Sequence, residues 1–420
     1  MLLGTNIEHA KSLNRRVVLE AVRRGGPTTR ADVARITGLT PQAVSNISAE
    51  LVAAGLIREG ERRRGRRGQP AAELSIDPCG GYAVGLNLGH QALTGVLVDL
   101  TGAALASEAR ALPRVDAPID LLVGEMEDLV EALIRGHGLP RDRLWGIGCG
   151  LPGLVRDGIF TVETFMADAP TMDYPLAEVL SGRLGLPVIA ENDARAAAIG
   201  ERLHGIGRQI QHFLYVHFGF GTGGGVVVAG QHYRGGSGGA GEIGHMIVKP
   251  GGRPCACGNR GCLEQYVSVF AAVEAVCGPD LAPDALLVEE LARRHAAGDA
   301  RLAAWIEHAA QYLRIAIHNI EVMFDPETVV IGGDLPDGIQ EALIARTLPL
   351  LPSVYPDAKP RLPRLMRAEA QDMPALGAAA LPIAAMVQPS LDLLWKARAG
   401  VGERLTLAQA VLGRPVAARS

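Results

Sequence analysis

The sequence EIGHMIVKPGGRPCACGNRGCLE, residues 242–264, is the most informative stretch of this 420-residue chain. It combines one imidazole with three closely spaced thiols, those of His245, Cys255, Cys257 and Cys262. Three thiolates and one imidazole complete the tetrahedral coordination of zinc and leave no position for a catalytic water. We therefore predict a structural Zn2+ site here. The alternative is a set of reduced, buried cysteines.

The glycines of this stretch suit a tight loop around a metal. Cys255 and Cys257 are two residues apart, so both must reach the ion from one turn. Gly258 and Gly261 allow the backbone to make that turn. The other cysteines have no such neighbours and are interpreted as packing residues: Cys79, Cys149 and Cys277.

The part of the chain before this motif is predicted to form a strand-rich lobe. Apolar residues make up 48% of the chain, so a folded protein is expected rather than a disordered one. The segments Tyr82–Leu88 and Leu93–Asp99 predict a β-hairpin, and residues 103–109 predict a third strand. A helix is expected over residues 121–136 and a buried strand over residues 144–150.

Polar residues follow the next predicted buried strand, at residues 186–190. Glu191, Asn192 and Asp193 come directly after it and lead into a helix expected over residues 194–204. Open α/β sheets bind ligands at the carboxyl ends of their parallel strands. We therefore expect a ligand site at this edge, although Asp193 could instead serve only as a helix N-cap.

A glycine-rich turn is expected between two further strands. Residues 212–216 predict one strand, residues 219–225 predict the turn, and residues 226–228 predict the strand that follows. A second glycine cluster occupies residues 235–241, just before the metal motif. The abundance of glycine is typical of an α/β protein with several tight, ligand-facing turns.

The hairpin, the Glu-Asn-Asp segment, the glycine-rich turn and the metal motif together resemble the ROK family (repressors, open reading frames and sugar kinases). The resemblance covers about residues 10–388. It implies the α/β, actin/hexokinase-like, two-lobed fold of that family, which in repressor members follows a winged helix. The ROK zinc signature implies that His245 and the three cysteines bind the metal.

The same resemblance implies a sugar site made of five residues: Asn192, Asp193, Glu242, His245 and Glu264. A ring of carboxylates and amides suits a sugar, because each hydroxyl both donates and accepts hydrogen bonds. His245 would serve both sites, since a metal on one ring nitrogen leaves the other as an N–H donor. For Glu242 the alternative is a solvated carboxylate.

The two turns that hold ATP phosphates in ROK kinases depart here from the family pattern. The first usually reads Asp-x-Gly-Gly-Thr, and here it carries Asn87, His90 and Gln91. The second usually reads Gly-Thr-Gly-x-Gly, and here Phe220 replaces its threonine. Phosphoryl transfer depends on positioning and charge stabilisation. We therefore expect no ATP binding and no enzyme activity, with Asp193 kept as a vestigial general base.

The first 80 residues are basic, whereas the rest of the chain is acidic. Residues 1–80 hold 13 Lys and Arg against 8 Asp and Glu, a formal charge of +5, and the remaining residues sum to −9. This asymmetry favours a polyanion partner at one end, although it could mark only a solvated face. Helices are expected over residues 14–24 and from Thr29, with Asp32 completing an approximate capping box.

A third helix is expected to read DNA. Thr40 is a good N-cap, and Pro41 suits the first helical position. The apolar residues at helical spacing are Val44, Ile47 and Leu51. The small polar residues left on the outer face are Gln42, Ser45 and Asn46. Such side chains suit base edges in the major groove. The alternative is an ordinary solvated helix face.

A glycine- and arginine-rich loop after this helix is interpreted as a wing. Strand-like residues 55–57 and 72–76 flank the loop, which contains Arg66 and Arg67. Such arginines hold phosphates or enter a narrow minor groove. The alternative is a flexible linker. The helices and the wing together predict a winged-helix, helix-turn-helix DNA-binding head.

The predicted domains are a winged-helix domain at 1–78, a small α/β lobe at 79–192 with about 372–388, a large lobe with the zinc motif at 193–371, and a C-terminal extension at 389–420. The predicted function is a sugar-responsive repressor of carbohydrate-metabolism genes. One alternative is an active sugar kinase with a DNA-binding head. The other is a DNA-binding protein whose body only oligomerises.

The expected partners are double-stranded operator DNA, a sugar or sugar-derivative effector, and further copies of the chain. Because palindromic operators match two-fold symmetric proteins, we expect a homodimer or a homotetramer. The first ten residues do not resemble a signal peptide, and no run of about 18 apolar residues occurs. We therefore expect a cytoplasmic protein without a membrane partner.

Overall fold

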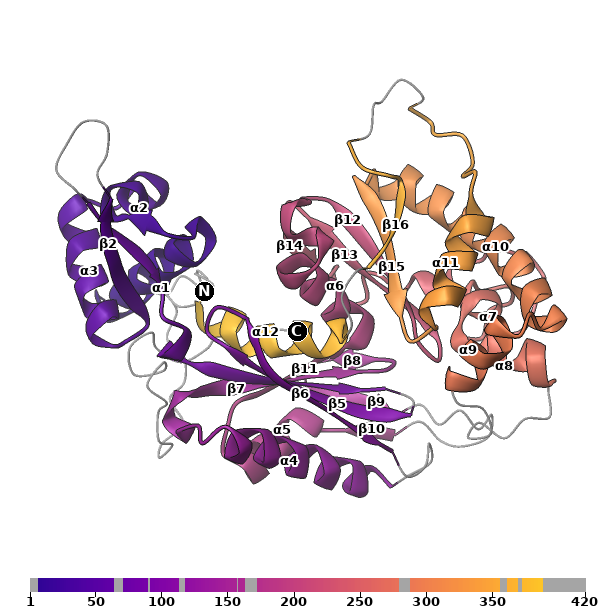
Figure 1. Ribbon diagram of the computed structural model, residues 1–420, viewed down its shortest axis with the longest axis horizontal. Coiled ribbons are helices and arrows are strands. Elements are labelled where there is room, and N and C mark those ends of the chain that lie inside the picture. The colour runs from indigo at the N-terminus through magenta and orange to yellow at the C-terminus, as the bar shows by residue number, and fades with distance from the viewer. Residues whose placement is uncertain are drawn as a thin grey trace.

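The structure is a computed structural model, and it describes residues 7–63, 71–89, 91–112, 118–156, 158–162, 172–278, 288–355, 361–368 and 372–387. These residues form a helical head and two helix-covered β-sheets (Figure 1). Several sequence predictions lie outside the described residues: those for His90, Arg66, Arg67 and the extension 389–420.

The head has the three helices and the two wing strands that the sequence predicts, together with a short strand at Thr28–Thr29 that it does not predict. Its elements are α1 (Ile7–Gly25), β1 (Thr28–Thr29), α2 (Arg30–Thr37), α3 (Pro41–Ala53), β2 (Ile57–Arg63) and β3 (Ala71–Ile76). The strands form an antiparallel sheet in the order β1-β3-β2. The first helix begins at Ile7 rather than at residue 14, because it extends beyond the apolar segment from which the sequence predicted it.

Capping residues set two helix starts in the head, as the sequence predicts. The Thr29 hydroxyl oxygen accepts from the Asp32 amide at 3.2 Å and donates to the Asp32 carboxylate at 2.7 Å. The Thr40 hydroxyl oxygen accepts from the Ala43 amide at 3.2 Å, and Pro41 occupies the first turn. These bonds satisfy amides that have no partner inside the helix. The turn between α2 and α3 is fixed accordingly.

The first body sheet has five strands in the order β11-β7-β4-β5-β6. The strands are β4 (Tyr82–Leu88), β5 (Ala92–Asp99), β6 (Ala104–Ala111), β7 (Leu144–Leu151) and β11 (Val188–Asn192). The first three form an antiparallel meander, while β7 pairs in parallel with both β4 and β11. A small sheet of β8 (Val155–Arg156), β9 (Ile159–Val162) and β10 (Met172–Tyr174) lies beside it.

Helices cover both faces of this first sheet. Helices α4 (Ile119–Gly136) and α5 (Leu176–Leu184) lie on one face, and α12 (Met373–Val387) lies on the other (Figure 1). The predicted strand at 186–190 is shifted by two residues. Pairing with β7 continues through Glu191 and Asn192, so these two polar residues end the strand instead of following it.

The second body sheet has the order β14-β13-β12-β15-β16. Its strands are β12 (Phe213–Phe218), β13 (Thr222–Val228), β14 (Gln231–Tyr233), β15 (Thr328–Gly333) and β16 (Leu365–Arg367). On one face lie α7 (Glu264–Val267), α8 (Val269–Cys277), α9 (Val288–Ala296), α10 (Ala300–Phe324) and α11 (Asp337–Thr347). The opposite face packs against α6 (Asp193–His204).

The glycine-rich turn is shorter than the sequence predicts. Strand β13 begins at Thr222, so Gly223 and Gly225 belong to the strand rather than to the turn. A methyl group at Gly223 would lie 2.8 Å from Ala194 Cβ, which is closer than side chains pack. The glycines are therefore needed for close packing of α6 on the strand as well as for turning the chain.

Helix α12 touches its neighbours through backbone atoms. A Cβ atom added at Gly377 would lie closer than 3.0 Å to the Ala196 carbonyl oxygen. A Cβ atom added at Gly200 would also lie closer than 3.0 Å to the Met373 carbonyl oxygen. Both glycines lie in the contact between α12 and α6. The two helices therefore pack without intervening side chains, so that a shift of one must be followed by the other.

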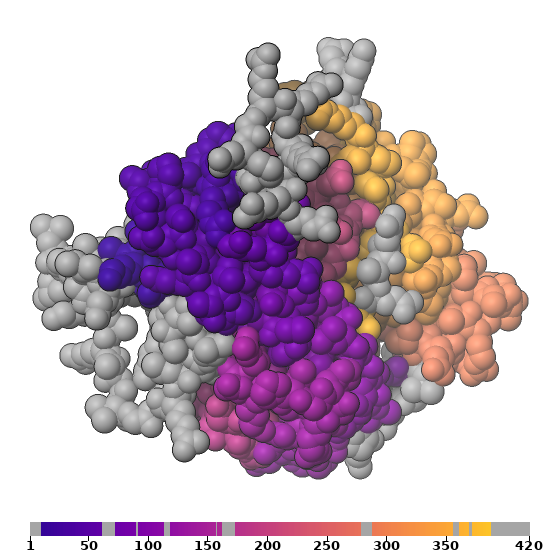
Figure 2. All heavy atoms as spheres, turned by 60° about the vertical axis from the view of Figure 1, so that its left-hand side comes forward, coloured from indigo at the N-terminus to yellow at the C-terminus, as the bar shows by residue number. Residues whose placement is uncertain are grey.

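The same helix joins the head to the body. Val18 and Val22 of α1 share one buried apolar cluster with Ile383 and Met386 of α12. The buried Arg16 donates a hydrogen bond of 2.9 Å from Nη1 to the carbonyl oxygen of Ala385. Figure 2 shows the head resting directly on the first lobe. The head and body thus form one packed unit.

The composition of α12 is mostly apolar, but its apolar residues are buried within the protein. Of the helices that the structure describes, none has the length and apolar composition that crossing a membrane requires.

We predict that Gly377→Ala strongly destabilises the protein. The added methyl group would meet the backbone of α6, and overpacking of this kind costs about 3 kcal/mol. The matched control is Gly124→Ala in α4, where no heavy atom lies within 4 Å of the new methyl group. There alanine should stabilise the helix by about 0.5 kcal/mol. Urea unfolding measures the free energy of unfolding of both variants. Equal changes in the two would show that the α6–α12 contact is not tight.

Candidate functional site

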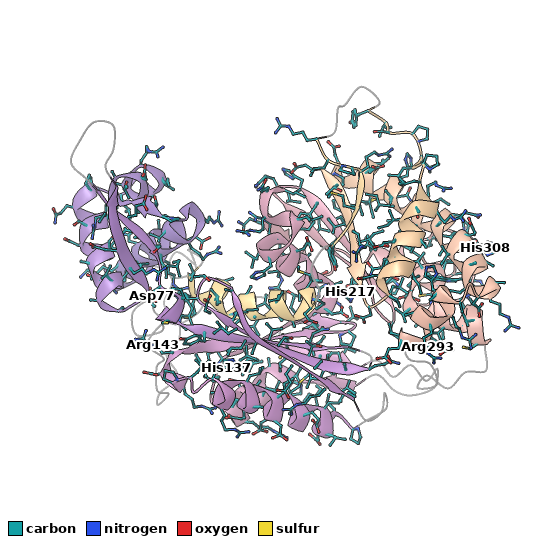
Figure 3. All side chains as sticks on the ribbon, in the orientation of Figure 1. Asp77, His137, Arg143, His217, Arg293 and His308 are labelled. Carbon is teal, nitrogen blue, oxygen red and sulfur yellow. The ribbon has the colours of Figure 1, made fainter. Side chains whose placement is uncertain are left out.

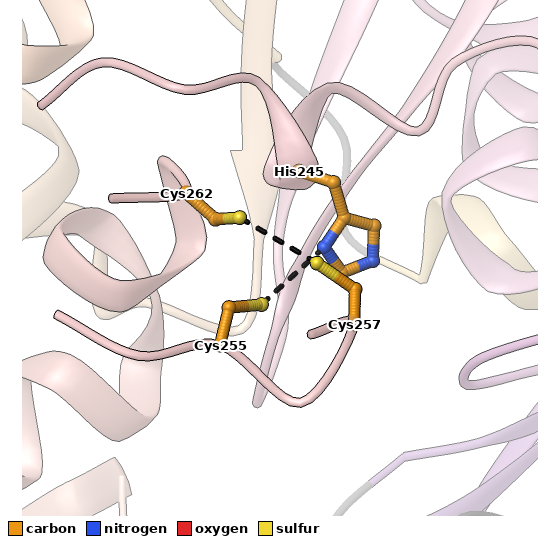
Figure 4. A group of neighbouring side chains, drawn as sticks. All are labelled: His245, Cys255, Cys257 and Cys262. Carbon is orange, nitrogen blue, oxygen red and sulfur yellow. Dashed lines mark hydrogen bonds between the residues drawn. The ribbon is translucent and has the colours of Figure 1, made fainter. Parts of the chain in front are cut away.

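The predicted metal ligands lie together. The ligand atoms of His245, Cys255, Cys257 and Cys262 are all within 4.8 Å of one another (Figure 4). The Cys255 sulfur is 3.6 Å from His245 Nδ1, and the sulfurs of Cys257 and Cys262 are also 3.6 Å apart. Thiolates on one tetrahedral ion at about 2.3 Å lie about 3.8 Å apart. The cluster therefore has the dimensions of a tetrahedral metal site.

The loop that carries the cysteines is held by its own backbone. The Cys255 amide donates to the Asn259 carbonyl oxygen at 3.0 Å, and the Gly258 amide donates to the Cys255 carbonyl oxygen at 3.0 Å. Gly258 and Gly261 have φ angles of +86° and +85°, which L-residues with side chains rarely adopt. The predicted requirement for glycine at these two positions is confirmed.

Glu264 touches the metal cluster. The Cys255 thiol donates to Glu264 Oε1 at 2.9 Å, and the same oxygen lies 3.5 Å from His245 Nδ1. Burial, together with this carboxylate, raises the pKa of the Cys255 thiol. A metal ion bound by the cluster would replace that proton, since metal binding deprotonates its thiol ligands. The cluster therefore fixes the position of Glu264, at the start of α7.

The end of β11 and the first turn of α6 carry the other polar residues. Asn192 is the N-cap of α6, because its Oδ1 accepts from the Arg195 amide at 3.2 Å. Its Nδ2 donates to the Gly153 carbonyl oxygen at 3.0 Å. The alternative role of N-cap considered for Asp193 is therefore wrong, since Asn192 makes that bond. Asp193 is instead the first residue of the helix.

Asp193 faces a histidine that the sequence analysis did not single out. Its Oδ1 accepts from the Ala194 amide at 2.7 Å, and its Oδ2 lies 3.9 Å from Nε2 of His217 on β12. Both side chains are largely buried. Burial raises the pKa of the Asp193 carboxyl group, and the nearby His217 opposes that rise. The predicted base is thus held in a mostly desolvated position.

Glu242 is linked to the same region through a buried arginine. Arg195 Nη1 lies 3.4 Å from Glu242 Oε1, and Arg195 Nε donates to Glu191 Oε1 at 2.7 Å. Arg234 Nη2 lies 3.2 Å from the other Glu191 oxygen. Glu242 is therefore paired rather than simply solvated. The sequence carries no local signal for the pairing of Arg195 with Glu242, because the two residues lie 47 positions apart.

The glycine-rich segment at the start of β13 lies between these groups. A Cβ atom added at Gly221 would lie 3.2 Å from Glu264 Oε2, and one at Gly224 would lie 2.9 Å from the Gly241 carbonyl oxygen, beside Glu242. Gly223 contacts Ala194, next to Asp193. The predicted sugar residues are therefore arranged around this segment. His245 and Glu264 contact each other directly, and Glu242 is connected to α6 through Arg195.

The residues at the two altered phosphate turns are engaged elsewhere or buried. The Gln91 side-chain oxygen accepts from the amide of Val288, at the start of α9 in the other lobe, at 3.2 Å. The Phe220 ring packs on Phe270 with ring centroids 5.2 Å apart. Asn87 Oδ1 is buried without a hydrogen-bond partner in the described part of the chain. The side chains at these positions are thus engaged in contacts within the protein or buried, whereas the loss of ATP binding stays a prediction.

The predicted DNA-reading residues lie on the exposed side of α3. Gln42, Ser45 and Asn46 are all exposed, and Gln42 Nε2 donates to Asn46 Oδ1 at 3.0 Å. Val44 and Leu51 on the opposite side are buried. The predicted division of this helix into an apolar and a polar face is confirmed, whereas contact with DNA stays a prediction.

Comparisons with known proteins match both parts of the chain. A family model described as "ROK family" matches residues 83–385, and one described as "MarR family" matches residues 14–68. The xylose repressor of Bacillus subtilis (strain 168) is 27% identical over 375 residues, which span 89% of this chain and 95% of that protein.

Solved structures match as well. A crystal structure of a ROK family transcriptional regulator, a homolog of the E. coli MLC protein, has a TM-score of 0.69 at 27% identity and covers 92% of this chain and 98% of its own. The ROK hexokinase of Thermus thermophilus has a TM-score of 0.55 at 30% identity, covering 71% and 96%. The predicted fold, an actin/hexokinase-like α/β body behind a winged helix, is confirmed.

We predict that Cys257→Ser abolishes tight metal binding. Removing one of four ligands leaves an incomplete tetrahedral set, so bound metal should fall from about one ion per chain to a small fraction. Inductively coupled plasma mass spectrometry of the purified protein measures this content. Cys79→Ser is the matched control, because Cys79 is outside the cluster and should leave the content unchanged. An equal metal content in both variants would contradict metal binding by the cluster of His245 and three cysteines.

Proposed function

The chain belongs to the ROK family, and we propose that it is a sugar-responsive, DNA-binding transcriptional repressor of carbohydrate-metabolism genes. The observation that carries this proposal is the packing of a winged-helix head and a ROK body into one core through α12. A relative that matches over most of its length is a xylose repressor. A ligand in the body can therefore act on the head through packed contacts within one chain.

In this proposal the DNA contacts come from α3 and from the wing. Gln42, Ser45 and Asn46 lie exposed near the start of α3, where side-chain amides can pair with base edges. Arg66 and Arg67 of the wing would contact phosphates or the minor groove. Double-stranded operator DNA is the partner that this combination fits.

The proposed sugar site consists of Asn192, Asp193, Glu242, His245 and Glu264. The carboxylates accept hydrogen bonds from sugar hydroxyls, and the histidine supplies a donor. The Asn192 amide already makes two internal bonds, but its oxygen has a second lone pair and its nitrogen a second hydrogen. It can therefore bind a sugar while it caps α6.

Zinc is the metal that we propose for the cluster of His245 and three cysteines. Thiolates select soft ions, and a closed set of three sulfurs and one nitrogen is typical of structural zinc. Bound there, zinc would hold the loop that carries Glu264 in place. The ion would have a structural role because no ligand position remains open for water.

We propose that the sugar signal passes from α6 through α12 to α1. The sugar residue Asp193 begins α6, and α6 packs backbone to backbone on α12 at Gly200 and Gly377. Helix α12 in turn shares the core of the head and accepts the Arg16 hydrogen bond. Coupling of this kind acts both ways, so sugar and DNA must change each other's affinity by the same factor.

The alternative is an active sugar kinase with a DNA-binding head. It is favoured by Asp193, a largely buried carboxyl group in the position expected of a general base, and by the similarity to a ROK hexokinase. The residues at the phosphate turns argue against it, because Phe220 and Gln91 are engaged in other contacts. We propose accordingly that ATP is not a ligand.

Self-association is part of the proposal, as a homodimer or a homotetramer. Palindromic operators need two heads related by two-fold symmetry. The outer side of α10 leaves Val322 and Met323 more than half exposed, which suits burial against another copy. If the body only oligomerised and bound no sugar, the melting temperature would not respond to any sugar.

We predict that Asp193→Asn abolishes the sugar response and leaves DNA binding intact. Genomic fragments retained by the protein supply the operator, and fluorescence anisotropy measures its Kd with and without D-xylose, D-glucose or N-acetyl-D-glucosamine. One sugar should change the operator Kd of the wild type by at least about tenfold, within the usual range of coupling energies. The matched control, Asp142→Asn on an exposed loop, should behave as the wild type.

Two outcomes would contradict the proposed function. The first is ATP-dependent phosphorylation of a sugar at ordinary kinase rates by the wild type, which would favour the kinase. The second is an operator Kd that no sugar changes, combined with a melting temperature that no sugar shifts, which would favour a body that only oligomerises.

We predict that Arg16→Met weakens the coupling between sugar and DNA. The variant keeps an unbranched apolar stem but loses the guanidinium group and its hydrogen bond to Ala385. The factor by which sugar changes the operator Kd should fall toward one, while the sugar Kd measured by calorimetry stays within about twofold. Lys11→Met, an exposed residue of α1, is the control. An unchanged coupling factor in Arg16→Met would exclude this junction from the path.

A further inference from the structure

We propose that His217 is a sugar-binding residue that holds, together with Asp193, the hydroxyl group that a kinase of this fold would phosphorylate. The inference rests on the proposed sugar site and adds a sixth residue to it.

The alternation of β12 brings His217 to α6. Phe213 and Tyr215 of this strand share an apolar cluster with Ala197 and Ala198 of α6. His217 follows two residues later on the same face of the strand, so it lies at the first turn of that helix. Figure 3 places the labelled His217 where the two body sheets approach each other. Its position is thus set by the strand and is not that of a mobile surface side chain.

The imidazole of His217 is buried and lies near Asp193 without a direct hydrogen bond to it. Its side chain is 4% exposed, and Nδ1 has no hydrogen-bond partner in the described part of the chain. Its other nitrogen, Nε2, lies 3.9 Å from Asp193 Oδ2, which is too long for a direct hydrogen bond. A ligand group between Nε2 and Oδ2 can therefore pair with both.

A sugar hydroxyl fits between the two groups. An oxygen atom about 2.8 Å from both His217 Nε2 and Asp193 Oδ2 would bridge their 3.9 Å separation. The hydroxyl would donate its hydrogen to the carboxylate and accept the Nε2–H of the imidazole. Each group would then make a hydrogen bond that it cannot make with the other.

The ring of His217 also lies beside the glycine-rich turn that precedes β13. A Cβ atom added at Gly219 would lie 3.3 Å from both Cδ2 and Nε2 of His217. The ring therefore lies against the first residue of that turn, while its Nε2 is 3.9 Å from Asp193 Oδ2. A hydroxyl held by both groups would keep its second lone pair free. It would lie at the end of α6 that faces this turn, with Asp193 and His217 as its two partners.

We predict a paired effect of the imidazole and the hydroxyl on sugar affinity. The probe is D-xylose, D-glucose or N-acetyl-D-glucosamine, whichever the wild type binds most tightly, together with its monodeoxy analogues. His217→Phe keeps a flat ring but removes the donor, so calorimetry should show about 10- to 100-fold weaker binding. His217→Gln, which keeps an N–H donor, should stay within about fivefold of the wild type. His308→Gln, on the exposed side of α10, is the control.

The monodeoxy analogues separate a contact from a folding defect. For the wild type, one analogue should bind about 10- to 100-fold more weakly than the parent sugar. His217→Phe should bind that analogue and the parent almost equally, because the hydroxyl has lost its partner. If the wild type binds sugar but His217→Phe binds as the wild type does, the sugar site stands and this inference is wrong. If the wild type binds no sugar of the panel, the proposed site and this inference are both wrong.

Discussion

The contact between α6 and α12 constrains the rest of this structure. At Gly377 and Gly200 the two helices meet backbone to backbone, with no room for a methyl group. Helix α6 follows the last strand of the first sheet directly and packs against the second sheet, while α12 shares a buried cluster with the head. Because the contact contains no flexible side chains, a movement of one helix must move the other.

The cluster of His245 and three cysteines supplies a second constraint. Its loop depends on Gly258 and Gly261 for its turns, and the Cys255 thiol of that loop contacts Glu264 at the start of α7. A sugar bound between these two supports, as we propose, would need little ordering of the protein, which preserves affinity. In the same proposal Asp193 binds the sugar, and His217 shares one of its hydroxyl groups.

Local signals were sufficient to predict much of this molecule. Thr29 and Thr40 mark helix starts through side-chain hydrogen bonds that span only three residues. The four predicted metal ligands lie within 18 residues of one another. His217, Arg195 and the bond of Arg16 to Ala385 were missed for one reason. Their partners are set by strand pairing and helix packing between distant segments, which no local pattern encodes. The exact end of β11 was missed because pairing with β7 continues through two polar residues.

The central claim is that one packed path joins the sugar site to the DNA-binding head. Its most direct test is the sugar Kd of the wild-type protein, measured by calorimetry without DNA and again with saturating operator DNA. The account predicts that DNA changes the sugar Kd by the same factor by which saturating sugar changes the operator Kd. A sugar Kd that is identical with and without the operator would contradict it.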